Sequence, residues 1–183
     1  CYDPPARSVR QRRRCLVLMR LIAPFLVSLG LWIPAVAHGQ DAALAAFNAW
    51  CFKAGQTADG IRTRMEQDTS SPLPFDLIFW DLSIEPTTHD VPAGVERRCE
   101  VSFSGNHTQQ AVQALRKQMA TPPVFGAVIP LPTTHTAEPG TVLIEGRELL
   151  RGRVAVVHVG QRNNQTFLAV DRLFDGLGLP REG

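Results

Sequence analysis

The chain has 183 residues, which suits one domain, and a hydrophobic fraction of 44% supports a packed core and argues against disorder. The formal net charge of +2 is unevenly distributed, because six arginines and one acidic residue precede Val36. The rest of the chain carries 13 basic and 16 acidic residues. A mildly acidic domain lacks the basic surface that binds nucleic acid, so nucleic acid is excluded as a partner class.

The N-terminal stretch has the pattern of a secretory signal peptide. The apolar run Leu21–Val36 follows Arg20 and leads into Ala35-Val36-Ala37, a small-x-small cleavage motif. We therefore predict a signal peptide over residues 1–37, with cleavage after Ala37, or after Gly39 as second choice. We expect Met19 to be the true start, so that residues 1–18 lie upstream of it.

A retained membrane anchor is the alternative interpretation of this run. A membrane span needs about 20 apolar residues, and this run is shorter and contains Pro24 and Pro34. We therefore expect an exported protein, periplasmic or secreted, with a single domain over residues 38–183. It would contact the membrane only if the segment were retained.

Two helical segments open the expected domain. Asp41–Ala54 begins at a plausible N-cap and is rich in alanine. Leu44, Phe47 and Cys51 recur at helical spacing, which predicts one apolar stripe containing Cys51. Thr57–Gln67 is a candidate second helix.

An aromatic and β-branched run follows at Phe75–Ile84 and predicts a strand. Apolar residues occur on both of its faces, which predicts either a central strand or a strand with one face available to a partner. Phe79 and Trp80 are the candidate contacts for that partner. The segment Glu85–Gly94 is expected to be a loop. Its His89 is a candidate binding residue, because loops carry function disproportionately.

Val95–Gly105 alternates between apolar and polar residues, which predicts a strand with one buried face. Val95, Arg97, Cys99, Val101 and Phe103 share that face. In an exported domain, Cys99 and Cys51 are expected to form a disulfide that pins the first helix to the sheet. The alternative is a nucleophilic thiol, which would need a reduced, partly exposed cysteine.

Thr108–Met119 has a helical apolar stripe, and Arg116 and Lys117 suit its C-terminal end. The proline-rich stretch Thr121–Pro139 predicts a binding loop or a surface crossing, with a short edge strand over Phe125–Leu131. Its His135 is the second candidate binding histidine.

The end of the chain predicts a meander of three strands, Thr141–Leu149, Arg153–Val159 and Thr166–Leu173, with a turn over Gly160–Gln165. Gly176–Gly183 is expected to be a tail. Together the segments predict an α+β fold, with helices on one face of an antiparallel sheet and a solvated opposite face.

Known catalytic motifs are absent from the sequence. It has no P-loop, HExxH, CxxC or GxSxG motif, and Gly176-Leu177-Gly178 lacks the third glycine of a dinucleotide fingerprint. The histidine spacing predicts no metal site, and His158 is expected to be a hydrogen-bonded core or edge residue. We therefore assign no catalytic residue, metal or cofactor from the sequence.

The stretches Leu73–Leu77, Val95–Phe103 and Glu145–Gly160 make the chain resemble small exported alphaproteobacterial proteins of unknown function. Some of those proteins carry the label succinyl-CoA synthetase β subunit. That family resembles an ATP-grasp ligase more than twice this length, and none of its phosphate loops or metal carboxylates can be matched to positions here.

Two hypotheses for function follow from the sequence. The first is a non-enzymatic binding or envelope-associated module whose partner is a protein or an envelope component. The second is a hydrolase with an unfamiliar site, in which His89 or His135 works with a carboxylate. The second requires a concave pocket that brings one of these histidines within hydrogen-bond reach of an acid.

Overall fold

A computed structural model of the chain describes residues 36–121 and 126–174. These residues form an α+β fold with three α-helices and one six-stranded antiparallel sheet. The elements are α1 (Val36–Ala46), the π-helical turn η1 (Phe47–Cys51), α2 (Ala58–Asp68), β1 (Asp76–Asp81), β2 (Val95–Ser104), α3 (Thr108–Met119), β3 (Val128–Ile129), β4 (Thr141–Glu148), the short 3₁₀ turn η2 (Leu150–Gly152), β5 (Val154–Arg162) and β6 (Gln165–Leu173).

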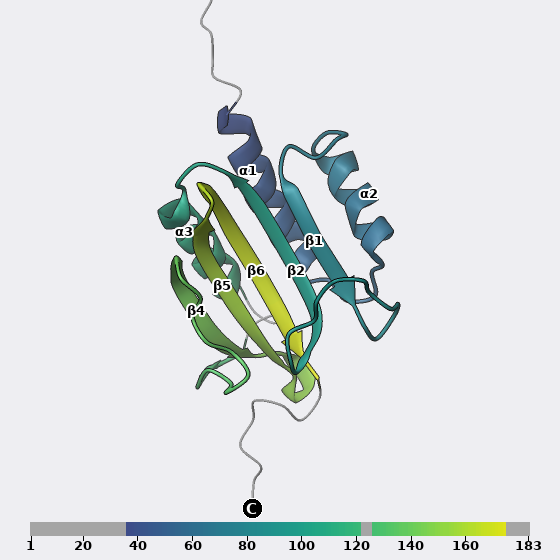
Figure 1. The fold of residues 1–183 in the computed structure, drawn as a ribbon, viewed down its shortest axis with the longest axis vertical. Helices are drawn as coiled ribbons and strands as arrows, with labels where there is room; N and C mark the ends of the chain where they lie inside the picture. The colour runs from purple at the N-terminus through teal and green to yellow at the C-terminus, as the bar shows by residue number, and fades with distance from the viewer. Residues whose placement is uncertain (1–35, 122–125, 175–183) are drawn as a thin grey trace, which may run out of the picture. The chain divides into compact units, whose positions relative to one another are not determined.

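The sheet has the strand order β1-β2-β6-β5-β4-β3, so β6, the last strand among the described residues, lies between β2 and β5 (Figure 1). β5 extends to Arg162 and pairs there with Gln165, beyond the strand end predicted from the sequence. The connection is only Asn163-Asn164, which have φ values of 48° and 60°. Two positive φ angles are typical of the tight hairpin turn that matches strand twist, and asparagine tolerates them.

The helices cover one face of the sheet, as predicted (Figure 1). The first helix begins earlier than expected and ends in the π turn η1, so helical structure stops at Cys51. The second expected helix is present as α2, where the Thr57 side chain accepts a hydrogen bond from the backbone N–H of Gly60. The helix predicted over 108–119 has those bounds in α3.

The main core lies between these helices and the sheet. Phe47, Ile61 and Leu115 come from helical segments and are fully buried against strand residues such as Val101 and Val157. Burying side chains of this size stabilises a fold by about 1.5–3 kcal/mol each.

The opposite face of the sheet is not simply solvated, which corrects the expectation from the sequence. Trp80, Val95, Val154 and Leu173 form a second buried cluster there. The register of β2 shifts between Val95 and Arg97, and this bulge places Val95 opposite Leu173. Val95 therefore leaves the face that the alternation assigned to it, because one extra residue reverses side-chain direction.

Cys51 and Cys99 are joined by a disulfide, as predicted from the sequence. The bond connects the last residue of η1 to the middle of β2, and both cysteines are buried. An intramolecular disulfide is compatible with an oxidising compartment.

The predicted signal peptide and its start site fall almost wholly outside the described residues, and the predicted tail 176–183 lies outside them as well. The predicted cleavage bond after Ala37 lies in the first turn of α1. Among the helices that the structure describes, none has the length and apolar character that crossing a bilayer requires.

The disulfide closes a loop between residues 48 apart in sequence. On the chain-entropy model we expect its removal, in a Cys51→Ala/Cys99→Ala protein, to lower the free energy of unfolding by about 4 kcal/mol. Urea unfolding with and without reductant measures this difference. Reductant should destabilise the wild type and leave the double variant unchanged, whereas two free thiols in native protein analysed by mass spectrometry would contradict the account.

Candidate functional site

A pocket of about 240 Å³ lies at the end of the helix-covered face, beside the disulfide. Its walls are mostly apolar and include Phe52, Leu149, Ala155 and Val170. Three arginines also line it, namely Arg97, Arg153 and Arg172. We call this feature the arginine pocket.

The pocket exists because helical structure stops at η1. The chain turns at Gly55, whose φ of 73° is in the left-handed region that favours glycine. The buried Gln56 side chain donates hydrogen bonds to the carbonyls of Trp50 and Lys53, at 3.0 and 3.1 Å. The Trp50 carbonyl also accepts a 3.1 Å hydrogen bond from the backbone N–H of Lys53, so the turn after η1 is held in place by several hydrogen bonds.

Two arginines that line the pocket, Arg97 and Arg172, belong to a network of buried charges. Asp81 is fully buried, and its carboxylate accepts hydrogen bonds of 2.9 and 3.1 Å from Nη2 of Arg172. Nε of Arg97 lies 3.9 Å from the same carboxylate, so one acid is shared by two guanidinium groups. Glu96 accepts a further bond of 2.7 Å from Nε of Arg172.

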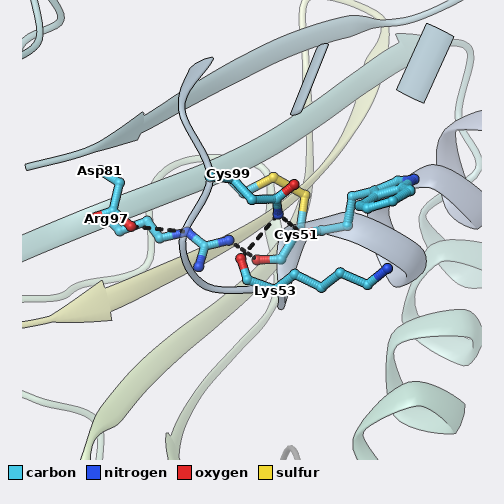
Figure 2. The surroundings of a disulfide bond; sticks show 7 residues. Cys51, Lys53, Asp81, Arg97 and Cys99 are labelled. Carbon is cyan, nitrogen blue, oxygen red and sulfur yellow. Dashed lines mark hydrogen bonds and ion pairs between the residues drawn. A yellow bond between two sulfur atoms is a disulfide. The ribbon is translucent and has the colours of Figure 1, made fainter. Parts of the chain in front are cut away.

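Arg97 connects this network to the disulfide. Its Nη2 donates a 2.8 Å hydrogen bond to the carbonyl of Cys51, and Figure 2 shows the guanidinium group between Asp81 and the disulfide. Burial, together with the nearby charge of Arg172, lowers the pKa of Arg97 to about 10 against the opposing effect of Asp81. Arg97 is therefore cationic at neutral pH, and its nearest carboxylate, that of Asp81, is 3.9 Å away.

A second group of polar residues lies on the opposite face of the sheet. We call His135, His158 and Asp171 the histidine cluster, because one ligand-type atom from each lies within 4.8 Å of the others. Nε2 of His135 is 3.3 Å from Oδ2 of Asp171, and Nε2 of His158 is 3.2 Å from the same oxygen. Arg98 donates to both carboxylate oxygens of Asp171 at 2.7 Å.

The environment of Asp171 favours its charged form. Burial by itself would raise the pKa of this carboxyl group. The hydrogen bonds from Arg98 and His135, with the close approach of His158, outweigh burial and hold the pKa well below its usual range. Asp171 is therefore a buried carboxylate anion at neutral pH.

A small recess borders the histidine cluster. Its volume is about 10 Å³, and its lining includes His158, Arg98 and Glu138. Glu100 also lines it and is ion-paired with Arg162, whose guanidinium group lies 4.2 Å from the centre of the Phe167 ring. The recess has room for about one water-sized ligand.

The structure places the predicted binding residues in different environments. Phe79 and Trp80 are 4% and 2% exposed, so they do not form the exposed partner surface expected from the sequence. Phe79 packs beneath Arg97, and Trp80 belongs to the second cluster. β1 is an edge strand of the sheet, so the central position that its apolar residues also suggested is wrong, although Phe79 and Trp80 are both buried.

The two candidate histidines also differ. His89 is exposed in the loop between β1 and β2 and lines neither the arginine pocket nor the histidine cluster. His135 is 8% exposed and packs against the sheet in the histidine cluster. The stretch after α3 therefore crosses the sheet face at this point, which is one of the two roles predicted for it.

Sequence reasoning missed Asp171, Arg98 and the role of His158 in the cluster. His158 and Asp171 are 13 positions apart in sequence, and only the register of β5, β6 and β2 brings these residues together. The available signal was Asp171 itself, a lone acid in a strand whose other residues are mostly apolar. Such an acid needs a buried cationic or hydrogen-bonding partner.

Comparison of this chain with protein-family models, with curated protein sequences and with solved structures returns no match.

Because the pKa of Asp171 is low in the folded protein, we expect the free energy of unfolding to decrease in acid. A carboxyl group in an unfolded chain has a pKa of about 3.9, so the stabilising contribution of Asp171 is fully present above that pH and decreases as the pH falls below it. We expect Asp171→Asn to lower the free energy of unfolding by about 3 kcal/mol at pH 7, because Arg98 loses its buried partner. The loss should be smaller at pH 3.

Urea unfolding between pH 3 and pH 7 measures both effects. Asp90→Asn is the matched control, because Asp90 is exposed in a loop. If the Asp171→Asn protein showed the same pH dependence of stability as the wild type, the account of Asp171 would be wrong.

Proposed function

We propose that this chain is an exported, non-enzymatic binding module whose arginine pocket receives a small ligand with an apolar body and an anionic head. The single observation that carries the proposal is the apolar pocket of about 240 Å³ with guanidinium groups in its wall. A well-formed apolar pocket with a few polar groups is the usual form of a small-molecule site.

The size and lining of the pocket define the ligand class. Pockets for drug-sized molecules span roughly 300–1,000 Å³, so a ligand for this pocket is smaller. The apolar walls favour a short hydrocarbon chain, since burial of apolar surface drives its transfer from water. A short-chain carboxylate has both properties and serves as the probe.

The charge in the pocket wall favours an anion. Arg97 donates to a neutral carbonyl and lies 3.9 Å from a carboxylate that Arg172 also uses. A carboxylate head group would therefore gain charge-assisted hydrogen bonds to groups that are already ordered.

Export into an oxidising compartment is part of the same proposal. The disulfide supports an oxidising compartment. The predicted signal peptide over residues 1–37 would direct the chain to the periplasm or outside the cell. The sequence led us to expect a protein or an envelope component as the partner, and we propose a small amphiphile in its place because of the size and lining of the pocket.

The hydrolase hypothesis meets only one of its two requirements. His135 does lie within hydrogen-bond reach of an acid, Asp171. The adjoining recess of about 10 Å³ has room for a water-sized group only. A wider hollow of about 210 Å³ shares Glu100, Arg162 and Phe167 with this recess, but neither histidine lines it. The arginine pocket is on the other face of the sheet. Among the described residues, the geometry therefore favours binding over hydrolysis.

Octanoate and octanol form a matched pair of probes for the arginine pocket. We expect calorimetry to show one octanoate bound per chain, with an affinity at least tenfold above that of octanol. The Arg153→Gln protein should lose about tenfold in octanoate affinity and little in octanol affinity, because a hydrogen bond to a charged group contributes about 1.5–3 kcal/mol.

A variant that obstructs the pocket supplies the control for location. Ala54 lines the pocket and is exposed, so Ala54→Trp should block binding without disturbing the core. Ala45→Trp places the same side chain on the exposed side of α1, outside the pocket lining, and should bind octanoate as the wild type does. Equal affinity for the two probes, or normal binding by the Ala54→Trp protein, would contradict the proposal.

A further inference from the structure

We propose that His135, His158 and Asp171 form a site for a divalent transition metal ion with the ligand preference of Zn²⁺. The site is independent of the arginine pocket, because it lies on the opposite face of the sheet and uses other residues. Two imidazole nitrogens and one carboxylate oxygen form a donor set that Zn²⁺ binds in proteins.

The distances between the donor atoms fit a tetrahedral ion. Zinc bonds of about 2.0–2.1 Å to nitrogen and oxygen require neighbouring ligand atoms about 3.3 Å apart in a tetrahedron. The two Nε2 atoms lie 3.3 and 3.2 Å from Oδ2 of Asp171. Two of the three donor-to-donor distances therefore already match a tetrahedral ion, and all three ligand-type atoms lie within 4.8 Å of one another.

A buried nitrogen in the cluster has no hydrogen-bond partner of its own. Nε2 of His158 is shielded from solvent and, within the part of the chain that the structure describes, lacks a partner of hydrogen-bond geometry despite its 3.2 Å distance from Asp171. Leaving such an atom unsatisfied costs about 1–3 kcal/mol. A metal ion between this nitrogen and the carboxylate would give the nitrogen a partner.

The surroundings of His135 and Asp171 fit the roles of metal ligands. Nε2 of His135 donates to Asp171 when it carries the ring proton, and Nδ1 is then an acceptor 2.9 Å from Oγ1 of Thr134. On metal binding the proton would lie on Nδ1, which would donate to Thr134 and leave the Nε2 lone pair for the ion. Arg98 fixes the orientation of the Asp171 carboxylate. Hydrogen-bonding partners of this kind orient metal ligands and set their tautomers.

Arg98 also opposes the site, because its positive charge shares the carboxylate with the ion. Glu100 and Glu138 interact electrostatically with Arg98 and line the adjoining recess, so they offset part of the added positive charge. The recess of about 10 Å³ beside His158 has room for a water-sized fourth ligand. Three protein ligands with one such position make a four-coordinate site.

Zinc titration of the full chain tests the proposal. The protein should carry no histidine tag, keep its disulfide and be treated with chelator beforehand. We expect calorimetry to show one Zn²⁺ per chain, and Co²⁺ substitution to produce the intense visible absorption of a tetrahedral ion. A wild-type protein without stoichiometric Zn²⁺ binding would overturn the proposal, and this result needs no variant to fold.

Variants then locate the ion. His135→Ala and His158→Gln should each reduce Zn²⁺ affinity at least tenfold, whereas His89→Ala should bind as the wild type does, because His89 is exposed and outside the cluster. Zn²⁺ should also raise the Tm of the wild type and of the His89→Ala protein, since a ligand that binds only the folded state stabilises it. Undiminished Zn²⁺ affinity in both cluster variants would overturn the proposed ligands.

Discussion

The covalent bond between Cys51 and Cys99 is the constraint on which the arrangement of the arginine pocket depends. It fixes the end of η1 against the middle of β2, so the helical layer stops where the arginine pocket begins. Arg97, two residues from Cys99 in β2, bonds the carbonyl of Cys51 and is thereby held in the pocket wall. The disulfide that stabilises the core therefore also holds the Arg97 guanidinium group beside the apolar walls of the arginine pocket.

The alternation of strand residues divides the buried charge between two faces. Arg97 and Arg98 are neighbours in β2, and they pair across the sheet with Arg172 and Asp171 of β6. Successive side chains in a strand point to opposite faces. Arg97 therefore lines the arginine pocket on the helix-covered face of the sheet, while Arg98 binds Asp171 in the histidine cluster on the opposite face.

Much of the fold could be predicted from the sequence because its signals are local. The bounds of α3 follow from its apolar stripe, and the burial of Cys51 and Cys99 follows from helical and strand periodicity. The position of Val95 could not be predicted, because a bulge is set by pairing with β6 rather than by composition. The burial of Trp80 likewise depends on Val95, Val154 and Leu173, which are distant in sequence.

The candidate sites were less predictable than the fold, since they depend on register between strands. The arginine pocket combines residues from the end of η1, from β2, from β6 and from around η2. Of the histidine cluster, only His135 was predicted from the sequence as a binding residue.

The central claim is that the arginine pocket binds a small anionic amphiphile. Nuclear Overhauser contacts between octanoate and methyl-labelled protein test this claim most directly. The account predicts contacts from the octanoate chain to the methyl groups of Ala155 and Val170, together with a shift of the Arg97 side-chain resonance. Contacts to other methyl groups only, or no contacts at saturating octanoate, would contradict it.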